Sequence, residues 1–236
     1  MKQSKRYAAT LKTYTAKQEY AFRDAIEVVK KNATAKFDES FDISIRLGVD
    51  PRKADQMVRG TVSLPHGTGK SVRVLVVAKS PKDQEALAAG ADYAGYTDYL
   101  EKLAGGWADI DIIIATPDVM GELGKLGRVL GPRGLMPNPK SGTVTFDVAK
   151  AVAETKAGKI EYRVDKAGNL QASIGKCSFD SAKLADNLTT FFGSIMRAKP
   201  SSAKGKYIRS INVTSTMGPG VTVTEASLTT KENSNS

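Results

Sequence analysis

Val72-Arg73-Val74-Leu75-Val76-Val77-Ala78 is the stretch that decides the fold of this chain. Its nearly continuous apolar run is typical of a strand that is buried on both faces of a sheet. Ile110-Asp111-Ile112-Ile113-Ile114-Ala115 has the same character. Helices are predicted between the two over residues 81–89, with Ser80 as cap and Pro81 at the first position, and over 98–103. Strands that alternate with helices predict a small parallel sheet with helices on its faces.

The two ends of the chain follow a different pattern. Apolar and polar residues alternate over 41–47 and 207–216, which indicates strands with one wet face. Further extended segments are expected over 56–64 and 221–223, and a hairpin is expected from 159–164 and 170–174 around Asp165-Lys166-Ala167-Gly168. These short alternating strands favour antiparallel pairing in a second sheet.

Two amphipathic helices accompany the alternating strands. The first is expected to begin at a Thr15/Gln18 capping box, to bury Ala16, Tyr20, Ile26 and Val29, and to stop at Asn32. The second spans 179–198, with an apolar side formed by Leu184, Leu188, Phe191, Phe192, Ile195 and Met196. A shorter helix is predicted over 147–157, and Gly158 is its expected stop.

The order of these patterns suggests a nested layout. Strands with one solvent-exposed face occur in both terminal parts of the chain. They can complete one sheet only if these two parts meet in space. The predicted fold class is therefore mixed α/β and α+β: a discontinuous outer α+β domain over 1–67 and 159–236, and an inserted Rossmann-like parallel α/β domain over 68–158. Two sequential domains are the alternative.

Composition excludes several classes of protein. The chain has 236 residues, one cysteine and one histidine, so a disulfide framework and a His-rich or multi-cysteine metal centre are not expected. The longest apolar run, 112–115, is too short to span a bilayer, and the basic start lacks the apolar core of a signal peptide. A formal charge of +10, from 35 Lys and Arg against 25 Asp and Glu, favours a polyanionic partner: nucleic acid first, an anionic membrane surface second.

Signals for catalysis are weak. Gly67-Thr68-Gly69-Lys70-Ser71 resembles the end of a phosphate-binding loop, but Leu64 stands where the first glycine is required and a strand follows instead of a helix. His66 fits a loop histidine near a hinge, and Cys177 fits a buried structural thiol better than a nucleophile. No cofactor is expected. A small α/β enzyme remains the alternative to a binding protein.

Three segments are candidates for nucleic-acid contact. Residues 121–142 combine six glycines and three prolines with Lys125, Arg128, Arg133 and Lys140, so no long regular element can form there. Lys36-Phe37 and Thr216-Met217-Gly218-Pro219 each lie beside a predicted strand. Lysine next to an aromatic ring offers a phosphate contact and a stacking face. The alternatives are a flexible surface loop for the first segment and a helix end and an ordinary turn for the others.

Longer motifs make the sequence recognisable. They are Lys36-Phe37-Asp38-Glu39, residues 47–56 (LGVDPRKADQ), 59–67 (RGTVSLPHG), 115–120 (ATPDVM), 131–140 (GPRGLMPNPK) and 216–219 (TMGP). With these motifs the chain resembles the bacterial ribosomal protein L-one family of the large-subunit stalk. The resemblance covers nearly the whole chain up to Val223.

The resemblance implies a cytoplasmic, non-catalytic protein that acts as a monomer within the large ribosomal subunit. It implies that the outer domain binds a helix junction of large-subunit rRNA, that the protein represses translation by binding its own operon mRNA, and that it helps tRNA leave the exit site. The residues to which it assigns rRNA and mRNA binding are Lys36, Phe37, Ser210, Thr216, Met217 and Gly218, to which we add Arg163 and Lys166. Candidates for tRNA or secondary RNA contact are Arg52, Lys53, Arg128 and Arg133.

Overall fold

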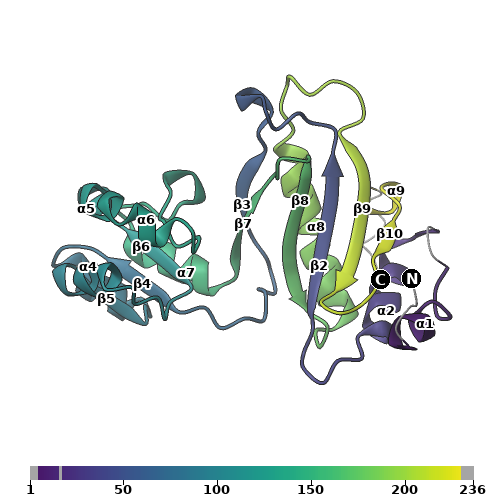
Figure 1. Ribbon diagram of the computed structural model, residues 1–236, viewed down its shortest axis with the longest axis horizontal. Coiled ribbons are helices and arrows are strands. Elements are labelled where there is room, and N and C mark those ends of the chain that lie inside the picture. The colour runs from purple at the N-terminus through teal and green to yellow at the C-terminus, as the bar shows by residue number, and fades with distance from the viewer. Residues whose placement is uncertain (1–4, 16–17, 230–236) are drawn as a thin grey trace. The chain divides into compact units, whose positions relative to one another are not determined.

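The computed structural model describes residues 5–15 and 18–229, and the chain folds into two compact units (Figure 1). Residues 1–69 and 160–236 belong to one, here called the outer unit, and residues 70–159 form the inner unit. The predicted mixture of α/β and α+β structure is confirmed. Within the described ranges, no helix is both long and apolar enough to cross a bilayer.

A five-stranded sheet forms the centre of the outer unit. Its strand order is β1-β10-β9-β2-β8, so segments from both ends of the chain lie next to each other within it. β2 lies antiparallel to both β8 and β9, with Ile43 opposite Ala172 and Val213. The strands are β1 (Glu19–Tyr20), β2 (Ser40–Leu47), β8 (Asn169–Lys176), β9 (Ile208–Ser215) and β10 (Val221–Val223). Their alternating burial matches the alternating sequence, as expected for a sheet with one covered face.

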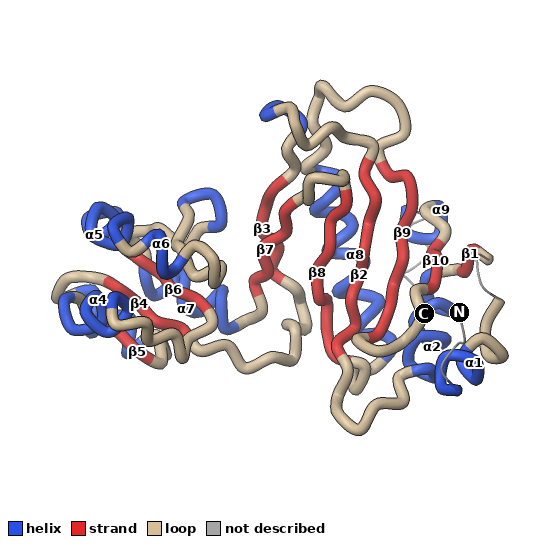
Figure 2. The backbone as a smooth tube through the Cα atoms, in the orientation of Figure 1, coloured by secondary structure: helices blue, strands red, loops and turns tan. Residues whose placement is uncertain are grey.

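Helices cover only one face of this sheet. Figures 1 and 2 show α2 (Phe22–Asn32) and α8 (Ser181–Arg197) behind it, and the face toward the viewer is open. Ile26 and Phe191 are almost fully buried in the shared core with Phe41 and Ile43. α1 (Lys5–Thr10) and α9 (Ala226–Thr229) are short helices near the ends of the chain. Met196, expected on the apolar side of α8, is instead exposed.

The first long helix starts later than its sequence predicts. Tyr20 pairs with Val223 in β1, and Thr224 N donates to Tyr20 O, so sheet pairing replaces the expected first turn. The helix begins at Phe22, and Gln18 N donates to the backbone oxygen of Thr15. The predicted capping box is therefore absent, and Ala16 lies outside the described residues.

The predicted hairpin is also wrong. β7 (Lys159–Arg163) pairs with β3 (Arg59–Ser63) in a separate two-stranded sheet, whereas β8 joins the large sheet. A tight turn does form, because Asp165 Oδ1 accepts from the amides of Ala167 and Asn169 at 2.8 Å. One bridge, Val164 to Leu170, follows the turn before the strands separate toward their partners.

The inner unit contains the predicted parallel sheet. Its order is β5-β4-β6, and all four residues of β4 (Val74–Val77) are buried. β6 (Ile112–Ala115) was predicted, but the short strand β5 (Tyr93–Gly95) was not. α3 (Lys82–Ala88) and α7 (Val148–Lys156) cover one face, and α4 (Thr97–Ala104), α5 (Met120–Lys125) and α6 (Gly127–Leu130) cover the other.

Two boundaries of the inner helices depend on local chemistry. α7 begins where Asp147 accepts from Lys150 N, and Gly158 follows the helix with a φ of 98° that favours glycine. Pro81 is the N-cap residue of α3, not its first residue, and no side chain caps that helix. The expected Ser80 cap is thus absent.

Acid titration should reveal the ion pairs at the entry to β4. Lys70 Nζ lies 2.8 Å from Asp111, which also accepts from Arg73 N, and these interactions lower the pKa of Asp111 to about 2. Because this pKa is below the unfolded value, the stabilisation is present above about pH 4 and is lost as the pH falls through 2. Asp111→Asn should therefore cost at most about 2 kcal/mol at pH 7 and almost nothing below pH 2. Denaturant unfolding followed by Trp107 fluorescence would measure both values. A difference that does not depend on pH would contradict the assignment.

Candidate nucleic-acid interface

Two segments from opposite ends of the chain meet where β2 begins and β9 ends. Phe41 pairs with Ser215 in the sheet. One step further out, Thr216 N donates to Ser40 O at 3.1 Å, and Ser40 N donates to Thr216 Oγ1 at 2.9 Å. The Thr216 hydroxyl therefore bonds across the end of the β2–β9 strand pair, so the loop before β2 and the turn after β9 lie side by side.

Buried Glu39 joins the same two segments through its carboxylate. Its Oε1 accepts from Ala35 N and its Oε2 accepts from Met217 N, each at 2.9 Å. The residue is only 2% exposed. A buried carboxylate needs such donors, because an uncompensated charge in the interior is strongly unfavourable. The carboxylate thus bridges the loop that carries Phe37 and the turn that carries Met217.

The side chains displayed at this junction are unusually exposed for their type. Phe37 is 56% exposed and Met217 is 52% exposed, and Lys36 and Thr216 are also exposed. We call residues 35–38 and 216–218 the Phe37–Met217 surface. An aromatic ring, a thioether and an ammonium group on a fixed backbone offer stacking, packing and phosphate contacts together.

Gly218 is required by a close approach inside the turn. A Cβ at this position would lie 2.4 Å from Ser215 Oγ, which is buried, and Gly218 N donates to Ser215 O. Any larger side chain would therefore push the turn away from β9. The glycine keeps the Phe37–Met217 surface tight.

The neighbouring turn after β8 supports the surface from beneath. Cys177 N donates to Glu39 O at 2.8 Å, and Asp38 accepts from Ser178 Oγ at 2.7 Å. Burial, together with the charge of Glu39, raises the pKa of the Cys177 thiol to about 11. The thiol therefore stays protonated at neutral pH, which fits the structural role expected for it.

The structure places the other predicted outer-unit residues elsewhere. Ser210 pairs with Arg46, about 20 Å along β9 from Thr216 at the usual rise per residue. Arg52 and Lys53 follow β2 at that same end, and Lys166 lies in the turn before β8. Arg163, exposed, ends β7 just before this turn. The predicted residues thus form two groups at opposite ends of one sheet.

Backbone hydrogen bonds hold the loops of this second end together. Leu47 N donates to Gly168 O at 2.8 Å, and Gly48 N donates to Tyr207 O at 2.7 Å. Gly48 is another close approach, since a Cβ there would lie 2.2 Å from Lys206 O. The basic residues of the second end therefore project from loops that are tied to each other.

Between the two ends lies the open polar face of the sheet. Asp42, Ser44 and Arg46 alternate with buried residues along β2. Thr214 and Asp42 are paired across the strands and line a depression of about 460 Å³ with Ser44, Gln171 and Ser173. This face offers hydrogen-bond donors and acceptors but few exposed apolar groups.

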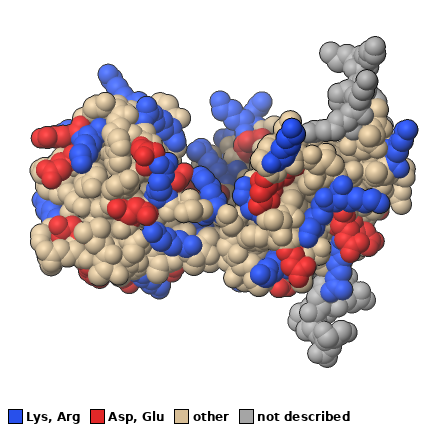
Figure 3. Space-filling view, turned by 90° about the horizontal axis from the view of Figure 1, so that it is seen from below, with Lys and Arg blue, Asp and Glu red and all other residues tan. Residues whose placement is uncertain are grey.

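Charges of both signs are mixed on the face seen from below (Figure 3). In the view from below, Lys and Arg side chains lie among Asp and Glu and do not form one basic field (Figure 3). Two of the four residues predicted to contact tRNA lie on the inner unit: Arg128 on α6 and Arg133 in the loop after it, both exposed. Arg133 Nη1 donates to Gly106 O at 3.0 Å.

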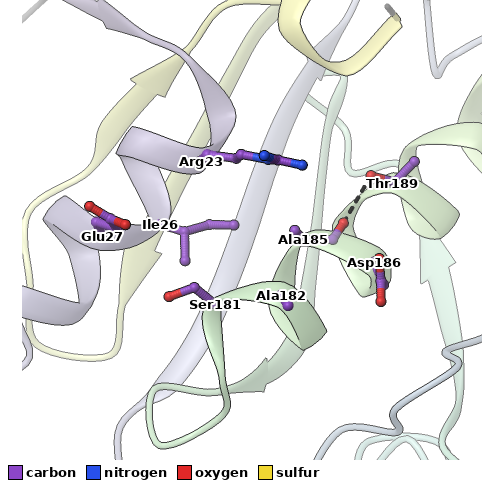
Figure 4. Close-up of a pocket in the computed structure, with 8 residues that line it drawn as sticks. All are labelled: Arg23, Ile26, Glu27, Ser181, Ala182, Ala185, Asp186 and Thr189. Carbon is purple, nitrogen blue, oxygen red and sulfur yellow. Dashed lines mark hydrogen bonds between the residues drawn. The ribbon is translucent and has the colours of Figure 1, made fainter. Parts of the chain in front are cut away.

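A groove between α2 and α8 contains none of the predicted site residues. It has a volume of about 430 Å³ and is lined by Ile26, Ala182 and Ala185 with a few polar groups. Figure 4 shows Arg23 extending across it and Glu27 on the opposite side of α2. It lies on the helical face of the sheet, away from the open one (Figures 1 and 4).

The residues weighed as catalytic candidates lie outside any metal-binding cluster among the described residues. No group of three or more His, Cys, Asp or Glu side chains there could hold a metal ion. His66 contacts Asp186 at 3.0 Å, while its backbone N donates to the buried amide of Asn187. The Gly67–Ser71 segment is followed by β4, so it has no helix N-terminus to bind phosphate.

Residues 29–219 match the Ribosomal protein L1p/L10e family. The chain belongs to this family. It is 65% identical over 206 residues to a protein of Chlorobaculum tepidum described as "Large ribosomal subunit protein uL1", a match that covers 87% of this chain and 89% of the relative. The matched residues include both segments of the Phe37–Met217 surface. The resemblance read from the sequence motifs is confirmed.

Proposed function

We propose that the protein is a non-catalytic constituent of the large subunit of the cytoplasmic ribosome and that it binds large-subunit rRNA through the Phe37–Met217 surface. The observation that carries this proposal is the junction itself, where the Glu39 carboxylate bridges two distant segments that expose Phe37 and Met217. Family membership supports the ribosomal role. The target is a structured helix junction at the base of the stalk.

Shape recognition explains the chemistry of the surface. A-form RNA presents a wide, shallow minor groove whose 2′-hydroxyls and phosphates are read through hydrogen bonds and close packing. Phe37 and Met217 supply flat apolar contacts to a base or sugar, and Lys36 supplies a phosphate contact. Ser210 extends the contact along the open face of the sheet.

We further propose two finer roles. The same surface binds a similar fold in the messenger of the protein's own operon and represses its translation. Arg52 and Lys53 at the second end, with Arg128 and Arg133 on the inner unit, contact the exit-site tRNA and assist its release. The exposed position of all four basic side chains supports this role. Arg163 and Lys166 of the outer unit are further contacts to rRNA and mRNA.

We also propose that the two units act as separate domains. The outer domain comprises 1–67 and 159–236, and the inserted, Rossmann-like domain comprises 68–158. Support comes from the division of the chain into two compact units at closely similar positions and from the parallel sheet order β5-β4-β6.

A salt titration tests the rRNA proposal. Binding to a stalk-junction RNA should weaken steeply as salt rises, with a log–log slope on the order of −0.7 to −0.9 per phosphate contact. An unrelated hairpin of equal length should bind more weakly at every salt concentration. Fluorescence anisotropy with labelled RNA would give both curves. Equal affinity for the two RNAs would refute specific recognition.

A further inference from the structure

We infer that Glu39 is a positioning residue for RNA recognition: it touches no RNA, but it sets the spacing of Phe37 and Met217. This inference rests on the proposed rRNA binding and deepens it. Glu39 lies beneath the surface at 2% exposure, whereas the two side chains that it positions are both more than half exposed. Its role is therefore to pre-organise a binding surface.

Hydrogen-bond geometry carries the first step. The two oxygens of one carboxylate accept from Ala35 N and Met217 N at 2.9 Å each, and the second bond spans 178 residues of sequence. Met217 N is the amide of the recognition residue itself, and Ala35 lies two positions before Phe37. One planar carboxylate therefore fixes the backbone positions of both the turn and the loop.

Two other contacts near the junction act at different points. Ser40 and Thr216 bond to each other at the end of the β2–β9 strand pair, which fixes where the two strands meet. Asp38 bonds to Ser178, so it ties the loop to the turn after β8 and not to Met217. Glu39 accepts from the backbone on both sides of the Phe37–Met217 surface.

The charge of Glu39 provides a test, because two effects predict opposite signs. A carboxylate near bound RNA repels phosphates, so its neutralisation should strengthen binding if charge alone mattered. If Glu39 acts by position, its neutralisation weakens binding. Glutamine keeps the size of the side chain but presents an NH₂ donor to one of the two amides, so one hydrogen bond is lost.

The experiment compares Glu39→Gln with Glu101→Gln, the same change at an exposed position on α4 of the inner unit. The probes are the stalk-junction RNA and an unrelated hairpin, and thermal unfolding establishes that each variant is folded at the assay temperature. We expect Glu39→Gln to weaken junction binding by about tenfold. Hairpin affinity and the salt slope should not fall, since no phosphate contact is removed. Glu101→Gln should leave junction affinity unchanged.

A second readout separates positioning from general stability. Hydrogen exchange at the Met217 and Ala35 amides should accelerate in Glu39→Gln, while exchange in β4 of the inner unit stays unchanged. Glu39→Asp keeps the charge but is one methylene shorter and cannot span both amides, so it should also weaken junction binding. It serves as the test if Glu39→Gln does not fold.

The outcomes are distinct. Folded Glu39→Gln that binds the junction as well as, or better than, the wild type overturns the positioning role, as does unchanged binding by Glu39→Asp. Wild-type protein that shows no preference for the junction RNA instead overturns the proposed function. Loss of junction affinity in both Glu39 variants, with Glu101→Gln unaffected, supports the inference.

Discussion

Met217→Glu should weaken binding to the stalk-junction RNA by about 100-fold, close to 3 kcal/mol, without unfolding the protein. The wild-type side chain is 52% exposed in a turn whose backbone is held by Glu39 and Ser40, so its replacement disturbs no core packing. The new carboxylate would face RNA phosphates and sugars and would remove the apolar contact that Met217 provides. Fluorescence anisotropy gives the affinity, and circular dichroism checks the fold.

Met196→Glu is the matched control for this prediction. Met196 is also partly exposed, at 38%, but it lies on α8, which covers the other face of the sheet. The two variants share the same change in charge and in residue type. Met196→Glu should lower affinity by no more than about threefold through long-range repulsion. Similar losses in both variants would show that charge, and not a localised contact, explains the result.

Most of the fold could be predicted because its strands have a clear period. The alternation over 41–47 and the apolar run over 72–78 each determine which faces are buried, and both are strands in the structure. The hairpin could not be predicted correctly, since the turn at Asp165 has ordinary hairpin chemistry. Which partner a strand finds after such a turn depends on β3 and β2, far away in sequence.

The site was predictable in part because the strands that flank it could be recognised. Lys36, Phe37, Thr216 and Met217 flank strands that pair with each other, so sequence reasoning could bring them together. Ser210 was grouped with them, but the rise of a strand carries it to the other end of β9. Its role stays a prediction. Two residues of one strand can contact the same part of a ligand only if they lie close together along that strand.

Glu39 shows a signal that sequence reasoning missed. The buried positions of β2 are Phe41, Ile43, Ile45 and Leu47, and Glu39 has the same parity. A period of two therefore points this acid inward. A buried carboxylate just before a strand requires hydrogen-bond donors. The nearest amides that are not paired within the sheet belong to the adjoining loops. The pattern thus predicts a bridging carboxylate, although not the segment that it binds.

Val76→Asp should unfold the inner unit and leave the affinity for the stalk-junction RNA within about threefold of wild type. Val76 is fully buried in β4, the central strand of the parallel sheet, between β5 and β6. A buried, unpaired carboxylate at such a site costs about 3–5 kcal/mol, which is comparable to the stability of a small domain. A shift of the Trp107 fluorescence emission toward that of the unfolded chain, and proteolysis within 70–159, would report unfolding.

Ile43→Asp makes the equivalent change in the core of the outer unit and is the comparison that gives Val76→Asp its meaning. Ile43 is 1% exposed in β2, two residues from Phe41, which pairs with Ser215 just before the Phe37–Met217 surface. Because this strand positions the surface, junction binding should be lost together with the fold. If Val76→Asp reduced affinity as severely as Ile43→Asp, RNA recognition would require the parallel sheet, and its assignment to the outer unit would be wrong.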